Sequence, residues 1–271
     1  KDTVIKILYD QLFKWLVKLI NKNINIETNT NNKFIGILDI FGFEVFENNY
    51  FEQLCINFTN EILQQQFNKY IFKLEQQEYK AENIDWTVID YPDNKDCIKL
   101  ITAKPFSIFT LLDEECTVGD NNDTAYHRKI LRHLKDNNRL SFNKKMMAKG
   151  LFTISHYAGN VTYNTKNFCF KNKQIMSPEL LELIYNSEHP LIKIIADDLK
   201  ITVSKHSVNK IFQKQLAKLM KLISKTNTHY IRCIKPNDIN KSNNFDNKKV
   251  VEQLRYAGVL EAIKVARAGY P

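Results

Sequence analysis

Hydrophobic residues recur every three or four positions along four stretches of the chain, and polar loops separate these stretches. This spacing predicts amphipathic helices at residues 1–21, 50–78, 208–223 and 250–267, the last interrupted by Gly258. The second helix exceeds the usual length of about 8 to 20 residues, which is typical of a mechanical element. A further helix start is predicted at Ser177-Pro178-Glu179, where a hydroxyl cap precedes a proline in the first turn.

A nearly continuous apolar run, FIGILDIFGF at residues 34–43, predicts a strand that is buried on both faces of a sheet. Such a strand needs neighbours, and the best candidate for one is HYIRCI at residues 229–234. Residues 151–163 predict a separate small hairpin that turns around Ala158-Gly159-Asn160. The pattern as a whole predicts an α/β fold that is mostly helical.

Composition supports a folded chain with a sizeable core. Of its 271 residues 44% are hydrophobic, and seven glycines and six prolines leave little room for long irregular stretches. The chain starts without Met, inside a predicted helix, so we expect a piece of a larger protein. No apolar run approaches the roughly 20 residues that span a bilayer, so we expect no membrane contact within this segment.

The five cysteines are scattered singly, with no CxxC pair and no His/Cys cluster at metal-ligand spacing. Neither a zinc site nor a disulfide framework is therefore expected. A reducing, cytoplasmic setting is the simpler interpretation of this cysteine usage.

The net charge of +9 is unevenly distributed. Residues 127–176 carry eleven Lys/Arg against one acid, Asp136, and residues 200–235 carry nine against none. The remainder is acidic, so the chain could present an oriented surface to an acidic partner. For the second segment, a solvated helix face explains the charge equally well, because its lysines recur at helical spacing.

Candidate chemistry gathers where the predicted strand ends, in DIFGFE at residues 39–44. A carboxylate such as Asp39 at the tip of a buried strand can reach a magnesium ion or its water shell. A glycine three residues later, Gly42, lets a backbone N–H approach a phosphate. Taken alone, the pattern is more typical of an Asp that caps a turn than of a nucleotide site.

The residues that follow change this interpretation, because the chain here resembles the myosin motor domain. DIFGFEVFENNYFEQLCINFTNEILQQQFN is similar to the family's switch II and relay helix, and LEQQEYKAENIDWTVIDYPDN to its relay loop. LLDEEC resembles the lower actin-facing subdomain, HYIRCIKPN the core strand, and VVEQLRYAGVLEAIKVARAGYP the reactive-thiol helices. The resemblance runs from about residue 5 to residue 271, and it implies part of a P-loop NTPase-type motor head.

The resemblance also implies a division of the chain. Residues 1–33 would form the first helix and loop, 34–49 a strand and switch II, and 50–92 the relay helix and loop. Residues 93–205 would form the lower actin-facing subdomain, and 206–271 a helix, the core strand and the reactive-thiol helices.

For the nucleotide, the resemblance implies ATP with Mg²⁺. Asp39 would hold the magnesium through water, and Phe41 and Gly42 would line the phosphate site, with the Gly42 N–H against the gamma-phosphate. Glu44 would pair with a switch I arginine outside this chain and close the site for catalysis. The relay would carry this movement to Trp86.

For partners, the resemblance implies the actin filament, and light chains or calmodulin through a lever that these residues do not include. The actin contacts would come from Thr117, Val118, Gly119 and Asp120 in a helix-loop-helix, and from Lys200 and Lys205 in a basic loop. The corresponding localisation is cytoplasmic and cytoskeleton-associated.

Two features depart from the family pattern. Tyr256 and Ala266 stand where the family has its two reactive thiols. TVGDNND at residues 117–123 stands where the family usually has a bulky apolar pair followed by proline and lysine, so the apolar contact is smaller and the charge is reversed.

No glycine of the chain is followed by lysine, so the P-loop must lie elsewhere and we expect the isolated chain to be inactive as an ATPase. A non-catalytic motor is one alternative. Another is a module that binds nucleic acid through the basic segments and nearby aromatic residues, although no RNP, KH or zinc-knuckle signature supports it.

Overall fold

The computed structural model describes residues 2–24, 35–83, 93–173, 178–199, 207–260, 263 and 267. These residues form two compact units. The smaller unit comprises Lys1–Asp39 and Asn172–Ile211, and the larger comprises Ile40–Lys171 and Phe212–Pro271. No described helix is long and apolar enough to cross a membrane.

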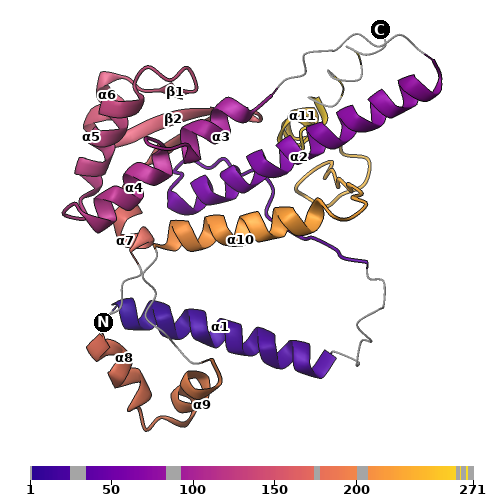
Figure 1. Cartoon of the computed structure of the whole chain (residues 1–271). Coiled ribbons are helices and arrows are strands. Elements are labelled where there is room, and N and C mark those ends of the chain that lie inside the picture. Colours follow the sequence, from indigo (N-terminus) through magenta and orange to yellow (C-terminus); the bar gives the residue numbers. More distant parts are fainter. Residues whose placement is uncertain are drawn as a thin grey trace. The chain divides into compact units, whose positions relative to one another are not determined.

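The smaller unit is built from three helices, α1 (Asp2–Ile24), α8 (Pro178–Tyr185) and α9 (Pro190–Leu199). The three helices pack together (Figure 1). Their core is formed by Ile7, Ile184 and Ala196, one residue from each helix. The first predicted helix is confirmed and extends slightly beyond its predicted end. The helix after residue 177 is confirmed at Pro178, whereas its predicted cap, Ser177, lies outside the described residues.

The larger unit is dominated by α2 (Phe51–Ala81), a single helix of 31 residues that confirms the long amphipathic prediction. The other helices of this unit are shorter: α3 (Lys95–Thr102), α4 (Ile108–Thr117), α5 (Asp123–Leu134), α6 (Lys144–Ala148) and α11 (Asn247–Tyr256). Two helices, α7 (Phe168–Asn172) and α10 (Val208–Ile223), continue from one unit into the other. Polar caps begin several of them, as Ser107 does for α4 and Asn122 for α5.

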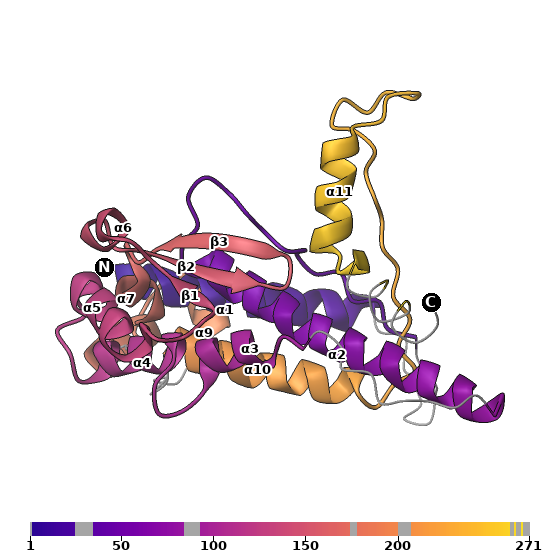
Figure 2. The same cartoon turned by 90° about the horizontal axis from the view of Figure 1, so that it is seen from above.

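The sheet of the larger unit has three antiparallel strands in the order β1 (Leu140–Ser141), β2 (Leu151–His156) and β3 (Gly159–Asn164). Strands β2 and β3 pair from Leu151 opposite Asn164 to His156 opposite Gly159, so Tyr157 and Ala158 form the turn. The predicted hairpin is therefore confirmed, with its turn just before the predicted one. Figure 2 shows this hairpin beside α2.

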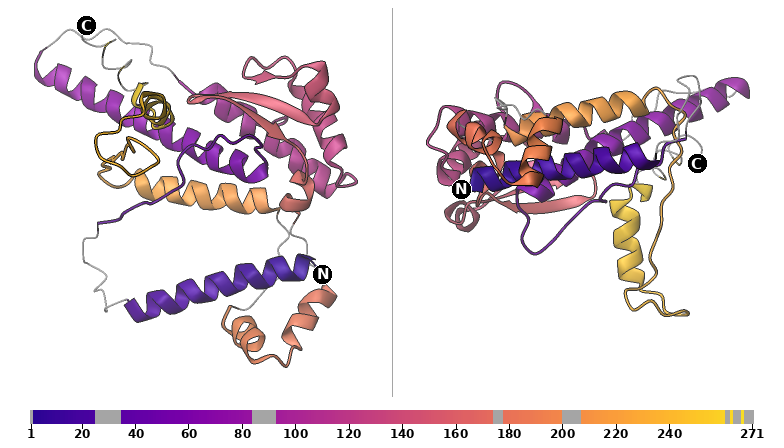
Figure 3. Two further views of the ribbon diagram at one scale, coloured as in Figure 1. Left: turned by 180° about the vertical axis from the view of Figure 1, so that it is seen from behind. Right: turned by 90° about the horizontal axis from the view of Figure 1, so that it is seen from below.

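Aromatic side chains pack together in the core between α2, α4 and α10. Phe58 of α2 meets Phe109 of α4 edge-on, with ring centroids 5.4 Å apart, and Phe212 of α10 lies 6.3 Å from Phe58. The ribbon of α10 accordingly runs beside α2 in both views of Figure 3. Such pairs add specific geometry to the apolar area that they bury.

The predicted interruption of the C-terminal helix at Gly258 is confirmed. Gly258 follows α11 with a φ of +69°, and a side chain there would begin 2.1 Å from Oε1 of Gln64 on α2. Only glycine satisfies both the backbone and the space, so α11 ends where Gly258 meets α2.

The two predicted central strands are wrong for the described residues. Residues 35–43 form no strand, and Ile35 and Ile37 are more than nine-tenths exposed. Residues 229–234 form none either. Instead Tyr230 packs on Phe67 of α2, and the Arg232 guanidinium lies 4.5 Å from the centre of the same ring. The physical reason is that no described segment pairs with either stretch as a neighbouring strand, so the ladder of main-chain hydrogen bonds that makes a sheet does not form there.

A pH-dependent contribution to stability is expected from His127, a buried residue of α5. Burial lowers the pKa of His127 from its ordinary value, although a 3.1 Å hydrogen bond between Nε2 and the Leu151 carbonyl partly offsets this. The unfolded chain therefore takes up the proton first as the pH falls. The contribution is present above the ordinary value of 6.5 and is lost as the pH falls through the lower folded value.

The measurement is the free energy of unfolding by denaturant across this pH range for the chain and for His127→Gln. Glutamine can still donate to Leu151 but does not titrate, so we expect a shallower loss of stability on acidification. Equal pH dependence in the two chains would contradict this assignment.

Candidate functional site

The 40–46 segment is held against α2 by side-chain amides. Asn57 accepts a hydrogen bond from the Glu44 N–H through Oδ1 and donates one to the Glu44 carbonyl through Nδ2, each at 2.8 Å. Asn60 donates to the Phe41 carbonyl at 3.1 Å. These bonds replace the partners that a neighbouring strand would supply, so the segment is fixed without being part of a sheet.

Asn49 repeats the same arrangement at the other end of the segment. Its Oδ1 accepts from the Phe46 N–H at 2.8 Å, and its Nδ2 donates to the Phe46 carbonyl at 2.9 Å. The Asn49 carbonyl also accepts from the N–H of Asn164, which ties this point to strand β3. The segment is therefore clamped to both α2 and the hairpin.

Within the segment, one side chain is buried and the residues on either side of it are half-buried or exposed. Phe43 is buried, and its ring centroid lies 5.3 Å from that of His156, 5.4 Å from that of Tyr157 and 5.6 Å from that of Tyr256. Phe41 and Gly42 are exposed, and a Cβ built on Gly42 would meet no atom within 4 Å. An incoming ligand could therefore reach the main chain at Gly42.

Two acids flank this exposed stretch. Asp39, at the end of the smaller unit's sequence range, has an exposed side chain. Glu44 is half-buried, and its Oε2 accepts a long hydrogen bond of 3.4 Å from Gln53. Thus its main chain is firmly held, while its carboxylate keeps capacity for a further partner.

Below the segment lies a shallow apolar hollow of about 190 Å³. Its lining comes from the segment itself, from α2 and from α10: Ile40, Phe41, Cys55, Ile56, Thr59 and Phe212. Burial raises the pKa of the Cys55 thiol well above its usual range, so the thiol is a neutral wall of this hollow rather than a nucleophile.

A buried polar chain continues from Asn57 into the core. Its Nδ2 lies 2.9 Å from the Tyr163 hydroxyl, which lies 2.9 Å from Nε2 of His156. Nδ1 of His156 lies 2.9 Å from Oε1 of Glu61 on α2. Glu61 also accepts from the Tyr157 N–H at 3.0 Å, so every member of the chain is engaged.

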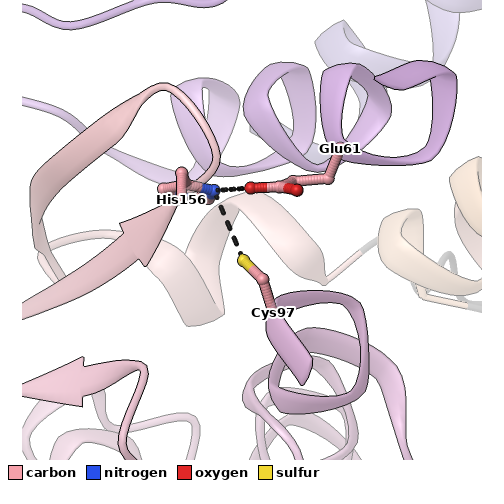
Figure 4. A group of neighbouring side chains, drawn as sticks. All are labelled: Glu61, Cys97 and His156. Atoms are coloured by element: carbon pink, nitrogen blue, oxygen red, sulfur yellow. Dashed lines mark hydrogen bonds and ion pairs between the residues drawn. The ribbon is translucent and has the colours of Figure 1, made fainter. Parts of the chain in front are cut away.

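Cys97 of α3 completes a group that could in principle ligate a metal. Its Sγ lies 3.6 Å from Nδ1 of His156, and Glu61, Cys97 and His156 offer ligand atoms within 4.8 Å of one another (Figure 4). Burial, with the nearby Glu61 carboxylate as a further cause, raises the pKa of the Cys97 thiol far above its usual range. A protonated thiol is a poor ligand, and the other two already bind one another, so we assign the group to the hydrogen-bonded core.

The predicted actin contacts lie where α4 and α5 form a helix-loop-helix: Thr117 is the last residue of α4, and residues 118–120 lie in the loop that follows. The Val118 side chain is 83% exposed, Asp120 is exposed, and the Thr117 hydroxyl donates to the Asp113 carbonyl at 2.7 Å. Val118 and Asp120 are therefore presented to solvent, whereas Thr117 closes the end of α4.

Beneath this loop lies a carboxylate that sequence reasoning missed. Glu115 is buried, its Oε2 lies 3.1 Å from Nζ of Lys129, and its Oε1 accepts from the Asn122 N–H at 3.3 Å. A Cβ on Gly119 would lie 2.5 Å from the same Oε1. A close approach of backbone to a carboxylate thus explains the glycine, and no spacing signal could have revealed it.

The basic segments are partly engaged within the fold. Lys171 pairs with Glu52 at 2.7 Å and lies over the Tyr50 ring, and Lys129 pairs with Glu114 and Glu115. Lys210, Lys214 and Lys218 on α10 are exposed. Among the aromatics that a nucleic-acid surface would need, Phe152, Tyr163 and Phe168 are fully buried, so this geometry does not favour that alternative.

Several predicted residues lie outside the described part of the chain: Trp86, Lys200, Lys205 and Ala266. Tyr256, at one predicted thiol position, is described. Its carbonyl accepts a 2.7 Å hydrogen bond from the Tyr157 hydroxyl, so it joins α11 to the hairpin turn.

Substitution of Gly119 tests the packing of the α4–α5 loop. Gly119→Ala should push the Glu115 carboxylate away from Lys129 and Asn122, lowering the free energy of unfolding by about 1 to 3 kcal/mol. Glu115→Ala, which clears the space, should make a second change at Gly119 nearly neutral. Denaturant unfolding of the two single variants and the double variant measures this coupling, and strict additivity would refute it.

Comparison with known proteins places the whole chain among homologues. A family model described as "Myosin head (motor domain)" matches residues 1–271. Myosin-52 of Schizosaccharomyces pombe is 44% identical over 289 residues, covering 100% of this chain and 19% of that protein. Protein OPAQUE1 of Zea mays is 42% identical, and Myosin-15 of Arabidopsis thaliana is 41% identical, each covering 100% of the chain and 18% of the relative. The chain thus spans about a fifth of the length of these relatives.

Proposed function

Because the chain belongs to the myosin head (motor domain) family, we propose that it forms part of an actin-based motor that couples ATP hydrolysis to movement along actin filaments. The observation that best supports this role is the 40–46 segment. Its main chain is clamped to the long helix α2 by Asn57, while Phe41 and Gly42 are exposed. A segment that senses a ligand and transmits its presence needs both properties.

We propose that residues 39–44 act as switch II. The donor set fits magnesium and phosphate, because Asp39 offers an exposed carboxylate and the space around Gly42 is open. Bound magnesium would neutralise charge on the phosphates, with Asp39 binding it through water. Phe41 and Gly42 would line the phosphate site, and the remaining phosphate contacts would come from a P-loop outside these residues.

Glu44 would close the site by pairing with an arginine outside this chain. Its main chain is held on both sides by Asn57, so its half-buried carboxylate can take a partner without dragging the backbone away from α2. This carboxylate would then orient the attacking water through the closed ion pair.

The helix α2 would serve as the relay. At 1.5 Å per residue its 31 residues extend roughly 46 Å, and the clamps at Asn57 and Asn60 lie in its first third. A tilt imposed at that end would be transmitted to the other end and to the following loop with Trp86. Light chains or calmodulin would act on a lever beyond these residues.

Two groups of residues would contact actin in different ways, one by long-range electrostatic attraction and the other by direct, tight binding. The loop between α4 and α5 presents Val118 at its surface, with Asp120 nearby, and Lys200 and Lys205 would supply long-range attraction to an acidic filament. The proposed setting is the actin cytoskeleton in the cytoplasm.

The switch assignment is tested by Glu44→Ala in a complete motor head, made by grafting residues 1–271 in place of the matching segment of Myosin-52. We expect ATP binding to remain nearly intact and hydrolysis to slow by roughly a hundredfold or more, because the contact forms only on closing. Single-turnover hydrolysis after rapid mixing measures both steps.

The matched control is Glu47→Ala, an exposed acid three residues further along, which should leave both rates unchanged. The chain alone should show no turnover above background. Unchanged hydrolysis in Glu44→Ala would sink the assignment.

The filament contact is tested in the same graft by cosedimentation with actin across a salt series. Replacing Lys200 and Lys205 by alanine should weaken binding mainly at low salt, through slower association. Val118→Phe with Asp120→Lys should strengthen nucleotide-free binding at all salts, through slower dissociation. Asp136→Lys, an equal charge change beyond α5, serves as the control for net charge. If Asp120→Lys left affinity unchanged or weaker, the loop would not lie at the interface.

A further inference from the structure

We propose that Glu61, His156, Tyr163 and Asn57 form a one-directional chain of hydrogen bonds that positions the main chain at Glu44, with His156 as the residue that sets its direction. The members come from α2, β2 and β3, and His156 and Glu61 are separated by 95 positions in the sequence. The chain of hydrogen bonds does not depend on the proposed function. Only the idea that it positions Glu44 for ATP hydrolysis rests on that proposed function.

The direction of the chain is determined at Asn57. The Glu44 N–H can only donate, so it must meet the amide oxygen of Asn57, and the amide nitrogen therefore faces the Glu44 carbonyl and Tyr163. Both hydrogens of that nitrogen are then used. The Tyr163 oxygen is consequently an acceptor toward Asn57.

The phenol hydrogen of Tyr163 is left to donate in the other direction. Burial raises the pKa of Tyr163 above its usual range, so the hydroxyl keeps this hydrogen. The atom in reach is Nε2 of His156 at 2.9 Å, which must therefore carry a lone pair. The ring hydrogen then lies on Nδ1 and is donated to Oε1 of Glu61, also at 2.9 Å.

The surroundings of Glu61 favour the same direction. Its carboxylate accepts from the Tyr157 N–H at 3.0 Å and from Nδ2 of Asn94 at 2.5 Å, so it is an acceptor on every side. Cys97, which also faces Nδ1 of His156, keeps its proton because burial raises the pKa of its thiol. Phe43 covers the ring with an edge-on contact.

The opposite tautomer would break the chain at two points. A hydrogen on Nε2 would point at the Tyr163 oxygen and leave the phenol hydrogen without its acceptor. The bare Nδ1 would face the carboxylate oxygen of Glu61, lone pair against lone pair. In a buried site each unmet group is costly, so His156 transmits the orientation of Glu61 to Asn57 and hence to Glu44.

The test is hydrogen exchange by NMR on the 271-residue chain, with the Glu44 amide as the reporter. The Phe46 amide is an internal reference, because it is held by Asn49 rather than by Asn57. Tyr163→Phe removes one link. The matched control is Thr162→Val on the same strand, which removes a hydroxyl bonded to Thr153 on the exposed side of the hairpin.

Two variants of His156 separate positioning from packing. His156→Gln can present an amide oxygen at the position of Nε2 and so keep an acceptor for Tyr163. His156→Asn can donate to Glu61 but is too short to reach Tyr163. Exchange of the Glu44 amide should accelerate at least about tenfold in Tyr163→Phe and His156→Asn, and little in His156→Gln and Thr162→Val.

Equal protection of the Glu44 amide in all four variants would overturn the proposal, as would equal loss in both His156 variants. The NMR chemical shifts of the His156 ring nitrogens in the unsubstituted chain provide a second test. This test does not depend on the folding of any variant. A hydrogen on Nδ1 alone is expected, and a hydrogen on Nε2 refutes the direction. Neither readout uses nucleotide, so failure here and failure of the hydrolysis tests are distinguishable.

Discussion

The placement of the 40–46 segment on the core of the larger unit depends on the two hydrogen bonds between the Asn57 side chain and the main chain of Glu44, each 2.8 Å long. An extended main chain normally satisfies its polar groups in a sheet, and one that cannot do so pays a desolvation penalty when it packs on a core. The amide supplies one donor and one acceptor from α2 instead. Phe43 can therefore be buried while Phe41 and Gly42 remain exposed.

A polar group that performs this task inside a core must itself be satisfied. Tyr163 and His156 extend the partners of Asn57 as far as Glu61, where main-chain and side-chain donors meet the carboxylate. Because Asn57, Tyr163, His156 and Glu61 are each hydrogen-bonded, a rotation of any of these four side chains leaves a buried group unmet, and a single arrangement is favoured. The same network links α2 to the hairpin, and it connects the segment proposed as switch II to the helix proposed as the relay.

The proposed filament contact shows a similar separation between residues that hold and residues that are presented. Glu115 and Lys129 brace the loop from beneath, and Gly119 allows the close approach, while Val118 points to solvent. The presented positions can therefore vary without loss of the loop. The helix-loop-helix therefore depends on Glu115, Lys129 and Gly119 rather than on the residues exposed at its tip.

The sequence by itself determined helices α1, α2, α10 and α11, the start of α8, the 151–163 hairpin and the family, because apolar spacing, capping residues and collinear motifs act over short stretches of chain. It also identified residues 39–44 and 117–120 as candidates, whose roles remain predictions. Only the tertiary structure decided which partners they have. Glu61, Cys97 and His156 come from three different elements. The close approach of the Glu115 carboxylate to Gly119 likewise follows no recognisable spacing in the sequence. The predicted strand at residues 34–43 failed for the same reason, because burial on both faces depends on neighbouring strands and not on the apolar residues of the strand itself.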